Sequence, residues 1–375
     1  MEGTRAQLIV LLETLIRTAT PTGQEKNLFP FLSQFLESRG FKVDVVPAAE
    51  VHPLTPPGEY ANLVARRGET DLLISAHLDT YPGDEGCSYE LKVDGDCAFG
   101  RGVVDVKGQI AALLVAVSQT DAPCLLGFVC DEEKGGAGSR SFDLNVPWAL
   151  VLEPTEFGIV VAHAGAVEVS VSFTGKSAHG SVPDKGDNAI EKALAFVDAL
   201  RTHPYIAHQR HPLFRSRQLM TIGRLVGGHD VMLVPDRSSL NLDIRVLPGY
   251  SAARVREIVS EVANRFKANL VVDDEAEPTE IPHDTLLTKA LQDACERTGV
   301  ATPGLVGYPS WTDAVNYIQK GMTSVVFGAG DLSVAHTERE HVSITDLLRL
   351  ADVLKEVIQS WKPFEGPTDR SAGPR

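Results

Sequence analysis

The chain has 375 residues, of which 43% are hydrophobic and 23% charged, and its 35 basic and 50 acidic side chains give a formal net charge of −15. This composition is typical of a globular chain of about two domains, and it excludes a wholly disordered protein. The acidic balance, without a cluster of Lys and Arg, excludes a nucleic-acid partner because such a surface repels phosphate.

The first part of the chain predicts a sheet flanked by helices. Apolar positions recur at helical spacing in residues 8–16 and again in residues 106–118. Three short runs, 71–76, 124–130 and 148–152, are apolar without alternation, as strands buried on both faces are. Because such strands alternate with helices here, we expect an α/β domain with a mainly parallel sheet.

The middle of the chain follows a different pattern. Apolar and polar residues alternate within its strands, which is typical of antiparallel strands with one face in water. The predicted order is strand 166–174, helix 188–201, strand 218–226, strand 238–246, helix 252–267 and strand 269–273. This β-α-β-β-α-β order predicts a ferredoxin-like α+β unit.

The α/β pattern returns in the last part of the chain, with a buried strand at 324–327 and a long helix at 344–360. We therefore expect a small α+β domain inserted into a larger α/β domain, followed by a polar tail too poor in apolar residues to fold. The expected bounds are 1–165 with 275–362 for the α/β domain, 166–274 for the inserted domain and 363–375 for a disordered tail.

Histidines and acids stand where the buried strands end. His77 and Asp79 end the first strand, residues 131–133 follow the second, Glu153 follows the third, and His336 lies beyond the fourth. In open α/β sheets, ligands collect at the carboxyl ends of the strands. Acids gathered there cost several kcal/mol unless a cation neutralises them, so the sequence predicts a metal site.

One more acid, Asp105, lies in the glycine-rich segment Gly100-Arg-Gly-Val-Val-Asp105 just before a predicted helix. The segment looks at first like a phosphate-binding loop of the G-x-G-x-x-G type. An acid stands where that pattern needs its last glycine, and an acid repels phosphate. We therefore assign Asp105 to the predicted metal site.

Five short motifs follow one another along the chain: His77-x-Asp79, Gly100-Arg-Gly-x-x-Asp105-x-Lys107-Gly108, Asp131-Glu132-Glu133, Glu153-Pro154-Thr155 and Ala335-His336-Thr337. Any one of them has an ordinary structural explanation, such as a solvated run of charges. Together and in this order, the chain resembles the co-catalytic di-zinc amidohydrolase and carboxypeptidase superfamily, which includes acetylornithine deacetylase, succinyl-diaminopimelate desuccinylase and dipeptidases. The resemblance extends to about residue 361.

The resemblance implies two zinc ions per subunit, with cobalt or manganese as substitutes. Asp105 would bridge them; one would also be held by His77 and Glu153, the other by Glu133 and His336. A water bridging the two ions would attack the amide, with Glu132 as general base. Asp79 would orient the ring of His77.

The resemblance also assigns roles within the inserted domain. The segment around His179 resembles a lid whose histidine reaches the neighbouring subunit's site and stabilises the oxyanion. Arg245 would bind the substrate carboxylate, which suits the bidentate geometry of arginine. Thr312 lies in a segment similar to that of the deacetylases and is assigned to substrate binding. Met232 departs from the pattern, because many relatives carry asparagine there.

The predicted function is hydrolysis of a small N-acyl amino acid, such as N²-acetylornithine, acetylcitrulline or acetyl-lysine. A dipeptidase or carboxypeptidase and a succinyl-diaminopimelate desuccinylase remain alternatives, since all share the catalytic residues. A metal-stabilised binding protein is disfavoured because the chain keeps Glu132, which is not itself a ligand.

The sequence also bears on location and assembly. No apolar run approaches the roughly 18 residues that span a bilayer, and the N-terminus lacks a secretory signal. The five cysteines show no paired spacing, as is typical of reduced thiols. We expect a cytoplasmic location, no membrane partner, and a homodimer formed by the strands of the inserted domain.

Overall fold

The computed structural model describes residues 2–49, 52–53, 55–81, 89–215 and 219–362. The predicted tail 363–375 and residue 218, the predicted start of a strand, lie outside these ranges. The chain forms two compact units. The first comprises Met1–Val160, Pro282–Leu305 and Thr312–Arg375, and the second comprises Val161–Ile281 and Val306–Trp311.

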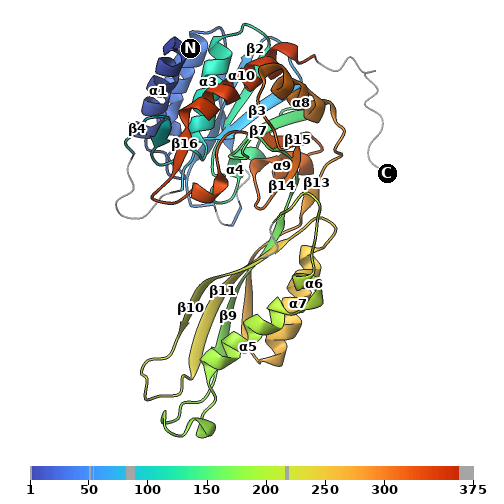
Figure 1. Cartoon of the computed structure of the whole chain (residues 1–375). Helices are drawn as coiled ribbons and strands as arrows, with labels where there is room; N and C mark the ends of the chain where they lie inside the picture. The colour runs from blue at the N-terminus through green and yellow to red at the C-terminus, as the bar shows by residue number, and fades with distance from the viewer. Residues whose placement is uncertain (1, 50–51, 54, 82–88, 216–218, 363–375) are drawn as a thin grey trace. The chain divides into compact units, whose positions relative to one another are not determined.

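The first unit is built on a central sheet whose middle strands are parallel (Figure 1). Strands β6, β3, β7 and β15 pair in parallel, whereas β1 and β2 at one end and β8 at the other pair antiparallel. The order is β1 (Lys42–Ala48), β2 (Tyr60–Arg67), β6 (Cys124–Val129), β3 (Leu72–His77), β7 (Trp148–Leu152), β15 (Thr323–Phe327) and β8 (Ile159–His163). The prediction of an α/β domain with a mainly parallel sheet is confirmed.

Helices cover this sheet, and its middle strands are buried on both faces. Helix α3 packs against α1 and α10, α10 packs against α8, and α9 packs against β7 and β15. Residues Lys107 to Val117 of α3 are all buried, which explains why this helix is apolar on every side. The helices are α1 (Glu2–Arg17), α2 (Phe29–Glu37), α3 (Lys107–Ser118), α4 (Ala137–Arg140), α8 (Leu286–Thr298), α9 (Asp313–Gln319) and α10 (Ile344–Ser360).

Short elements complete the first unit and the region of β8. A small antiparallel sheet has the order β16, β5, β4, and β13 and β14 both pair with β8. The sequence patterns did not predict these short strands. Their bounds are β4 (Lys92–Asp94), β5 (Cys97–Phe99), β13 (Thr279–Glu280), β14 (Leu305–Tyr308) and β16 (His341–Ser343), with short 3₁₀ helices η1 (Glu25–Leu28) and η3 (Leu332–Val334).

The second unit has the predicted ferredoxin-like topology. Its antiparallel sheet has the order β10, β11, β9, β12, with α5 and α7 on one face (Figure 1). Along β11, residues alternate between buried and half-exposed, as the period-two pattern predicts. The elements are β9 (Gly165–Thr174), η2 (Pro183–Lys185), α5 (Ala189–Arg201), α6 (Pro204–Ala207), β10 (Met220–Gly227), β11 (Arg237–Val246), α7 (Ala252–Arg265) and β12 (Asn269–Ala276).

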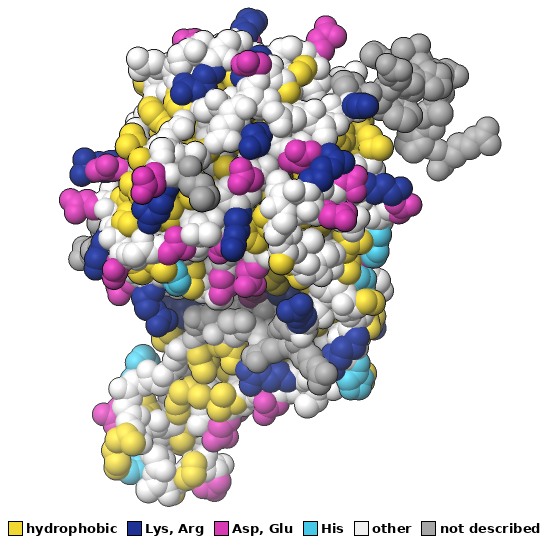
Figure 2. Space-filling view, turned by 45° about the horizontal axis from the view of Figure 1, so that its top comes forward, with side chains coloured by type: hydrophobic (Ala, Val, Ile, Leu, Met, Phe, Trp, Pro, Cys, Tyr) yellow, Lys and Arg dark blue, Asp and Glu magenta, His cyan; other side chains and the backbone are white. Residues whose placement is uncertain are grey.

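The surface of the second unit carries exposed hydrophobic side chains, which gather in yellow patches on that unit in Figure 2. On β10, Leu225 and Val226 are 42% and 49% exposed, and in the following loop Val231 is 94% exposed. Within the described residues of the whole chain, the helices are too short or too polar to cross a membrane.

Candidate metal centre

The predicted ligands lie at the carboxyl ends of the parallel strands. His77 is the last residue of β3, Glu153 follows β7 directly, and Glu133 lies in the turn after β6. Asp105 lies two residues before the first residue of α3, and His336 lies two residues after η3. Parallel strands bring their carboxyl ends to one edge of the sheet, which explains why residues from five distant segments meet.

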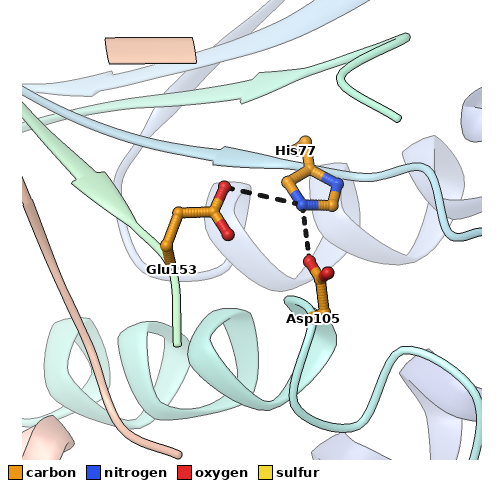
Figure 3. A group of neighbouring side chains, drawn as sticks. All are labelled: His77, Asp105 and Glu153. Atoms are coloured by element: carbon orange, nitrogen blue, oxygen red, sulfur yellow. Dashed lines mark hydrogen bonds and ion pairs between the residues drawn. The ribbon is translucent and has the colours of Figure 1, made fainter. Parts of the chain in front are cut away.

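The first group consists of His77, Asp105 and Glu153, all of them buried (Figure 3). The Nε2 atom of His77 lies 3.0 Å from Oδ1 of Asp105 and 3.7 Å from Oε1 of Glu153. The Nδ1–H of His77 donates to the backbone carbonyl of Asp79 at 2.9 Å. Because a carbonyl oxygen can only accept, Nδ1 carries the hydrogen, and Nε2 is the atom available to a metal.

The second group consists of Asp105, Glu133 and His336. The Nε2 atom of His336 lies 3.2 Å from Oδ2 of Asp105 and 3.0 Å from Oε2 of Glu133. Asp105 therefore belongs to both groups, with Oδ1 facing His77 and Oδ2 facing His336. In each group the possible ligand atoms lie within 4.8 Å of one another.

The electrostatics of these groups fit divalent cations. Burial and the charge of Asp105 raise the pKa of Glu153 well above its ordinary value, although His77 opposes the shift. Burial likewise raises the pKa of Glu133. The Oε1 atom of Glu153 is buried and has no hydrogen-bond partner among the described residues. A buried carboxylate oxygen without a donor is costly, and imidazole with carboxylate is a donor set that suits zinc.

Asp79 holds the turn that carries the two adjacent glutamates. Its carboxylate accepts hydrogen bonds from the backbone amides of Glu132 and Glu133, both at 3.1 Å, and from the hydroxyl of Thr22 at 3.0 Å. The contact of Asp79 with the ring of His77 runs mainly through its backbone carbonyl, since the nearest carboxylate oxygen is 3.6 Å from Nδ1. Asp79 thus contacts three predicted site residues at once.

Glu132 belongs to neither group of ligands among the described residues. Its backbone lies between Asp131, which has a φ of +65°, and Glu133. Burial raises the pKa of Glu132 well above its ordinary value; His77 opposes the shift, and Glu153 and other nearby acids add to it. Glu132 therefore lies near the ligands without being grouped with them.

Glu340 is a site residue that the sequence patterns missed. Its buried carboxylate accepts hydrogen bonds from the amides of Gly102 at 3.0 Å and Val104 at 3.1 Å, and from the guanidinium of Arg101 at 3.0 Å. The amide of Asp105 lies 3.4 Å from the same carboxylate. Glu340 thus shapes the loop that presents the shared aspartate. It lies in the same short segment as His336, but only the fold brings it to residues 101–105.

Gln109 adds a second support to this loop. Its side-chain amide donates to the carbonyl of Val104 at 3.1 Å, and its Oε1 accepts from the amide of Ala329 at 3.1 Å. The loop of Asp105 is thereby joined to the turn that follows β15, the strand that leads toward His336.

Thr312 has a structural role in the described fold. Its side chain is buried, and its hydroxyl accepts from the amide of Ala314 and caps helix α9. Its assignment to substrate binding stays a prediction. The neighbouring Asp313 is a buried acid that the patterns missed. Burial raises its pKa to about 7, although a hydrogen bond from Ser139 opposes the shift.

His179 and Arg245 belong to the second unit. His179 is exposed, and its ring contacts the hydroxyl of Ser181 at 2.9 Å. Arg245 lies on β11 on the face opposite the buried Leu242 and Ile244, as predicted. It donates from Nε and Nη2 to Asp243 at 3.0 and 2.8 Å, so this acid holds the guanidinium in place.

Comparison with known proteins supports the same conclusion as the motifs. The signature of peptidase family M20/M25/M40 matches residues 73–360. The chain is 28% identical over 364 residues to an acetylornithine deacetylase of Vibrio atlanticus, covering 90% of this chain and 92% of that protein. It is 26% identical over 362 residues to an acetylornithine deacetylase of Photorhabdus laumondii, covering 90% of both.

Solved structures share the fold. The crystal structure of a tripeptidase from Staphylococcus aureus superposes with a TM-score of 0.76 at 20% identity, covering 95% of this chain and 98% of that one. Human carnosine dipeptidase 1 superposes with a TM-score of 0.69 at 16% identity, covering 95% and 97%.

Proposed function

The chain belongs to peptidase family M20/M25/M40, a family of hydrolases that use divalent metal, and from this premise we propose that it removes the acyl group from a small N-acyl amino acid. The observation that carries the proposal is the shared Asp105, whose two oxygens face two separate ligand groups. The acetylornithine deacetylases among the relatives, similar over nine-tenths of the chain, support the acyl amino acid as substrate.

Two zinc ions fit the two groups, with cobalt or manganese as substitutes. His77, Glu153 and Asp105 would hold one ion, and Glu133, His336 and the same Asp105 would hold the second. When bound, such ions polarise a carbonyl group and lower the pKa of water. The raised pKa values of Glu133 and Glu153 support this assignment, because two neighbouring buried acids stay charged only beside cations.

Glu132 is the general base of the proposed reaction. It takes the proton of the attacking water and gives it to the nitrogen of the leaving amine, so that the amide bond breaks. In the turn after β6, Glu133 is grouped with Asp105 and His336 and Glu132 is not, which supports Glu133 as a ligand and leaves Glu132 to act as the base. Hydrogen bonds from the backbone amides of both glutamates to the carboxylate of Asp79 hold the backbone of this turn in place.

The inserted domain supplies the substrate contacts. Arg245, held by Asp243, binds the substrate carboxylate, and His179 stabilises the oxyanion in the site of a second subunit. Exposed apolar residues on β10, an edge strand of its sheet, support a homodimer formed through this domain.

The experiment that tests the proposal is amine release by the zinc- and cobalt-loaded enzyme across a matched panel. The panel contains N²-acetylornithine, N²-acetylcitrulline, N²-acetyl-lysine, succinyl-diaminopimelate and several dipeptides, with Glu132→Gln as the inactive control. We expect one acetylated amino acid to be cleaved fastest. Faster cleavage of dipeptides would replace the proposal with a peptidase, and preference for the succinyl compound with a desuccinylase.

A further inference from the structure

Tyr81 lies beside the second ligand group and has no part in the proposed reaction. It follows Asp79 by two residues, in the segment after β3, and the residue is 37% exposed. Its ring stacks on the imidazole of His336, with 4.5 Å between the ring centroids and 13° between the planes. The two rings are therefore nearly parallel and in contact.

The backbone of Tyr81 contacts the other ligand of the same group. Its amide donates to Oε1 of Glu133 at 2.8 Å. One residue thus contacts both members of the second group that are not shared with the first: the ring contacts His336 and the amide contacts Glu133. In the first group, by contrast, His77 is itself buried and held through Nδ1.

His336 needs this support more than the other histidine does. Its side chain is 43% exposed, whereas that of His77 is 1% exposed. It lies in a turn after η3 with a φ of +63°, outside any helix or strand. An exposed ring in a turn can rotate about its side-chain bonds, and ordering it on metal binding costs conformational entropy. A flat ring stacked against it removes much of that freedom beforehand.

Two cations flank the stacked ring. The ammonium of Lys134 lies 5.8 Å from the centroid of Tyr81, and the guanidinium of Arg101 lies 6.0 Å from it. Both are at the outer limit of a cation–π contact. Arg101 is also bound to Glu340, so the surroundings of the ring are tied to the loop of Asp105.

We propose that Tyr81 is a positioning residue for the second metal ion, its ring fixing the imidazole of His336 and its amide fixing the carboxylate of Glu133. The inference rests on the proposed two-metal site. It goes beyond that site because it states that the ring of Tyr81, which is not a ligand, increases the affinity of the second group for its metal ion. The phenol hydroxyl has no role in it.

The test compares metal binding by Tyr81→Leu and Tyr81→Phe. The leucine variant loses the flat ring but keeps the backbone amide, and the phenylalanine variant keeps both. We expect Tyr81→Leu to weaken the second metal equivalent by about 10- to 100-fold, as loss of a residue that orients a ligand does, while the first equivalent binds as before. Tyr81→Phe should bind both equivalents as the wild type does.

The measurements are calorimetric titration of the metal-free protein with Zn²⁺ and the absorption spectrum on stepwise addition of Co²⁺, which reports each site separately. Phe99→Leu is the matched control: Phe99 contacts His341, a histidine in neither group, with ring centroids 5.6 Å apart. This control should leave both equivalents unchanged. If Tyr81→Leu lowers the melting temperature, Tyr81→Val removes the same ring with a side chain suited to extended backbone.

Normal binding of the second equivalent by Tyr81→Leu would overturn the inference while leaving the proposed function intact. Equal loss in Tyr81→Phe and Tyr81→Leu would also overturn it, because the hydroxyl would then be responsible. A wild-type protein that binds a single equivalent would instead overturn the two-metal site, and the positioning role with it.

Discussion

At the scale of single residues, the proposed reaction gives different roles to two adjacent acids, Glu132 and Glu133. The backbone amides of Glu132 and Glu133 each donate a hydrogen bond to a different carboxylate oxygen of Asp79. These bonds fix the register of the turn, so that Glu132 and Glu133 do not exchange positions. Of these two glutamates, only Glu133 lies within hydrogen-bonding distance of His336. This difference supports the proposed division between Glu132 as base and Glu133 as ligand.

Glu132→Gln should abolish turnover and leave the metal content unchanged. The amide is similar in size to the carboxylate but cannot take a proton, and loss of a general base costs about 10²- to 10⁴-fold in rate. The measurements are kcat on the best substrate and metal content by elemental analysis. Glu133→Gln, by contrast, should lose metal as well, and the exposed Glu338→Gln should change neither. Loss of metal in Glu132→Gln would make Glu132 a ligand.

Metal affinity should rise with pH between about pH 6 and pH 9, because ions compete with protons for the ligands. Burial lowers the pKa of His336, but hydrogen bonds to Asp105 and Glu133 outweigh it and raise the pKa to about 10. In His77, burial is likewise outweighed by hydrogen bonds to Asp105 and Asp79, and the pKa rises well above its usual value. The ring of His336 is therefore protonated at pH 7 without metal, the shift in His77 favours its protonated form as well, and metal binding must displace these protons.

Calorimetry at constant pH in two buffers with different ionisation enthalpies measures this proton release. The apparent binding enthalpy should differ between the buffers in proportion to the protons displaced. Identical enthalpies in both buffers would mean that the imidazoles are already neutral in the metal-free protein, contrary to the prediction.

At the scale of elements, the loop before α3 is held by one carboxylate from a distant segment. Glu340→Gln should destabilise the metal-free protein by about 1–3 kcal/mol, since a buried donor would lose its acceptor. A glutamine keeps one oxygen, but its NH₂ group would face a backbone amide or Arg101, all of which are donors. Metal affinity should fall too, because the loop presents Asp105.

Denaturant unfolding of the metal-free protein measures its free energy of unfolding without any contribution from metal binding. Titration with Zn²⁺ then measures the metal affinity. Glu338→Gln, an exposed acid two residues earlier, is the matched control and should behave as the wild type does. Unchanged stability and affinity in Glu340→Gln would show that the loop holds its shape without this carboxylate.

The strands that the sequence predicted differ in length and burial from the strands that it did not predict. The parallel strands β3, β6, β7 and β15 are continuous apolar runs, because helices cover both of their faces, and that pattern is visible without a fold. The short strands β4, β5 and β16 have three residues each, too few to show a period. The histidines and acids near strand ends could be selected as candidate ligands from position alone, whereas the contacts of Glu340, Gln109 and Tyr81 exist only in the tertiary fold.

At the scale of the whole molecule, the proposed function needs residues from both units and, for His179, from a second subunit. Light scattering at micromolar concentration should give twice the 40.5 kDa mass of the chain. Val226→Lys places a charge on the exposed edge strand β10 and should shift the protein toward monomer. Val10→Lys, on the exposed side of α1 at 62% exposure, is the matched control and should remain dimeric. A monomeric wild type would contradict the dimer.

Mixing two inactive variants tests whether His179 serves the site of its partner. His179→Ala should lower kcat far more than it weakens metal binding, because the side chain is exposed, lies in the second unit and is not grouped with the ligands. Glu132→Gln lacks the base. A mixed dimer has one subunit of each variant. The site of the His179→Ala subunit keeps its own Glu132 and receives His179 from the Glu132→Gln subunit, so one of the two sites is complete. Since random exchange makes half of the dimers mixed, activity should recover to about a quarter of the wild-type value.

Exchange that restores no activity, while light scattering shows that mixed dimers form, would place His179 in its own subunit's site or outside catalysis.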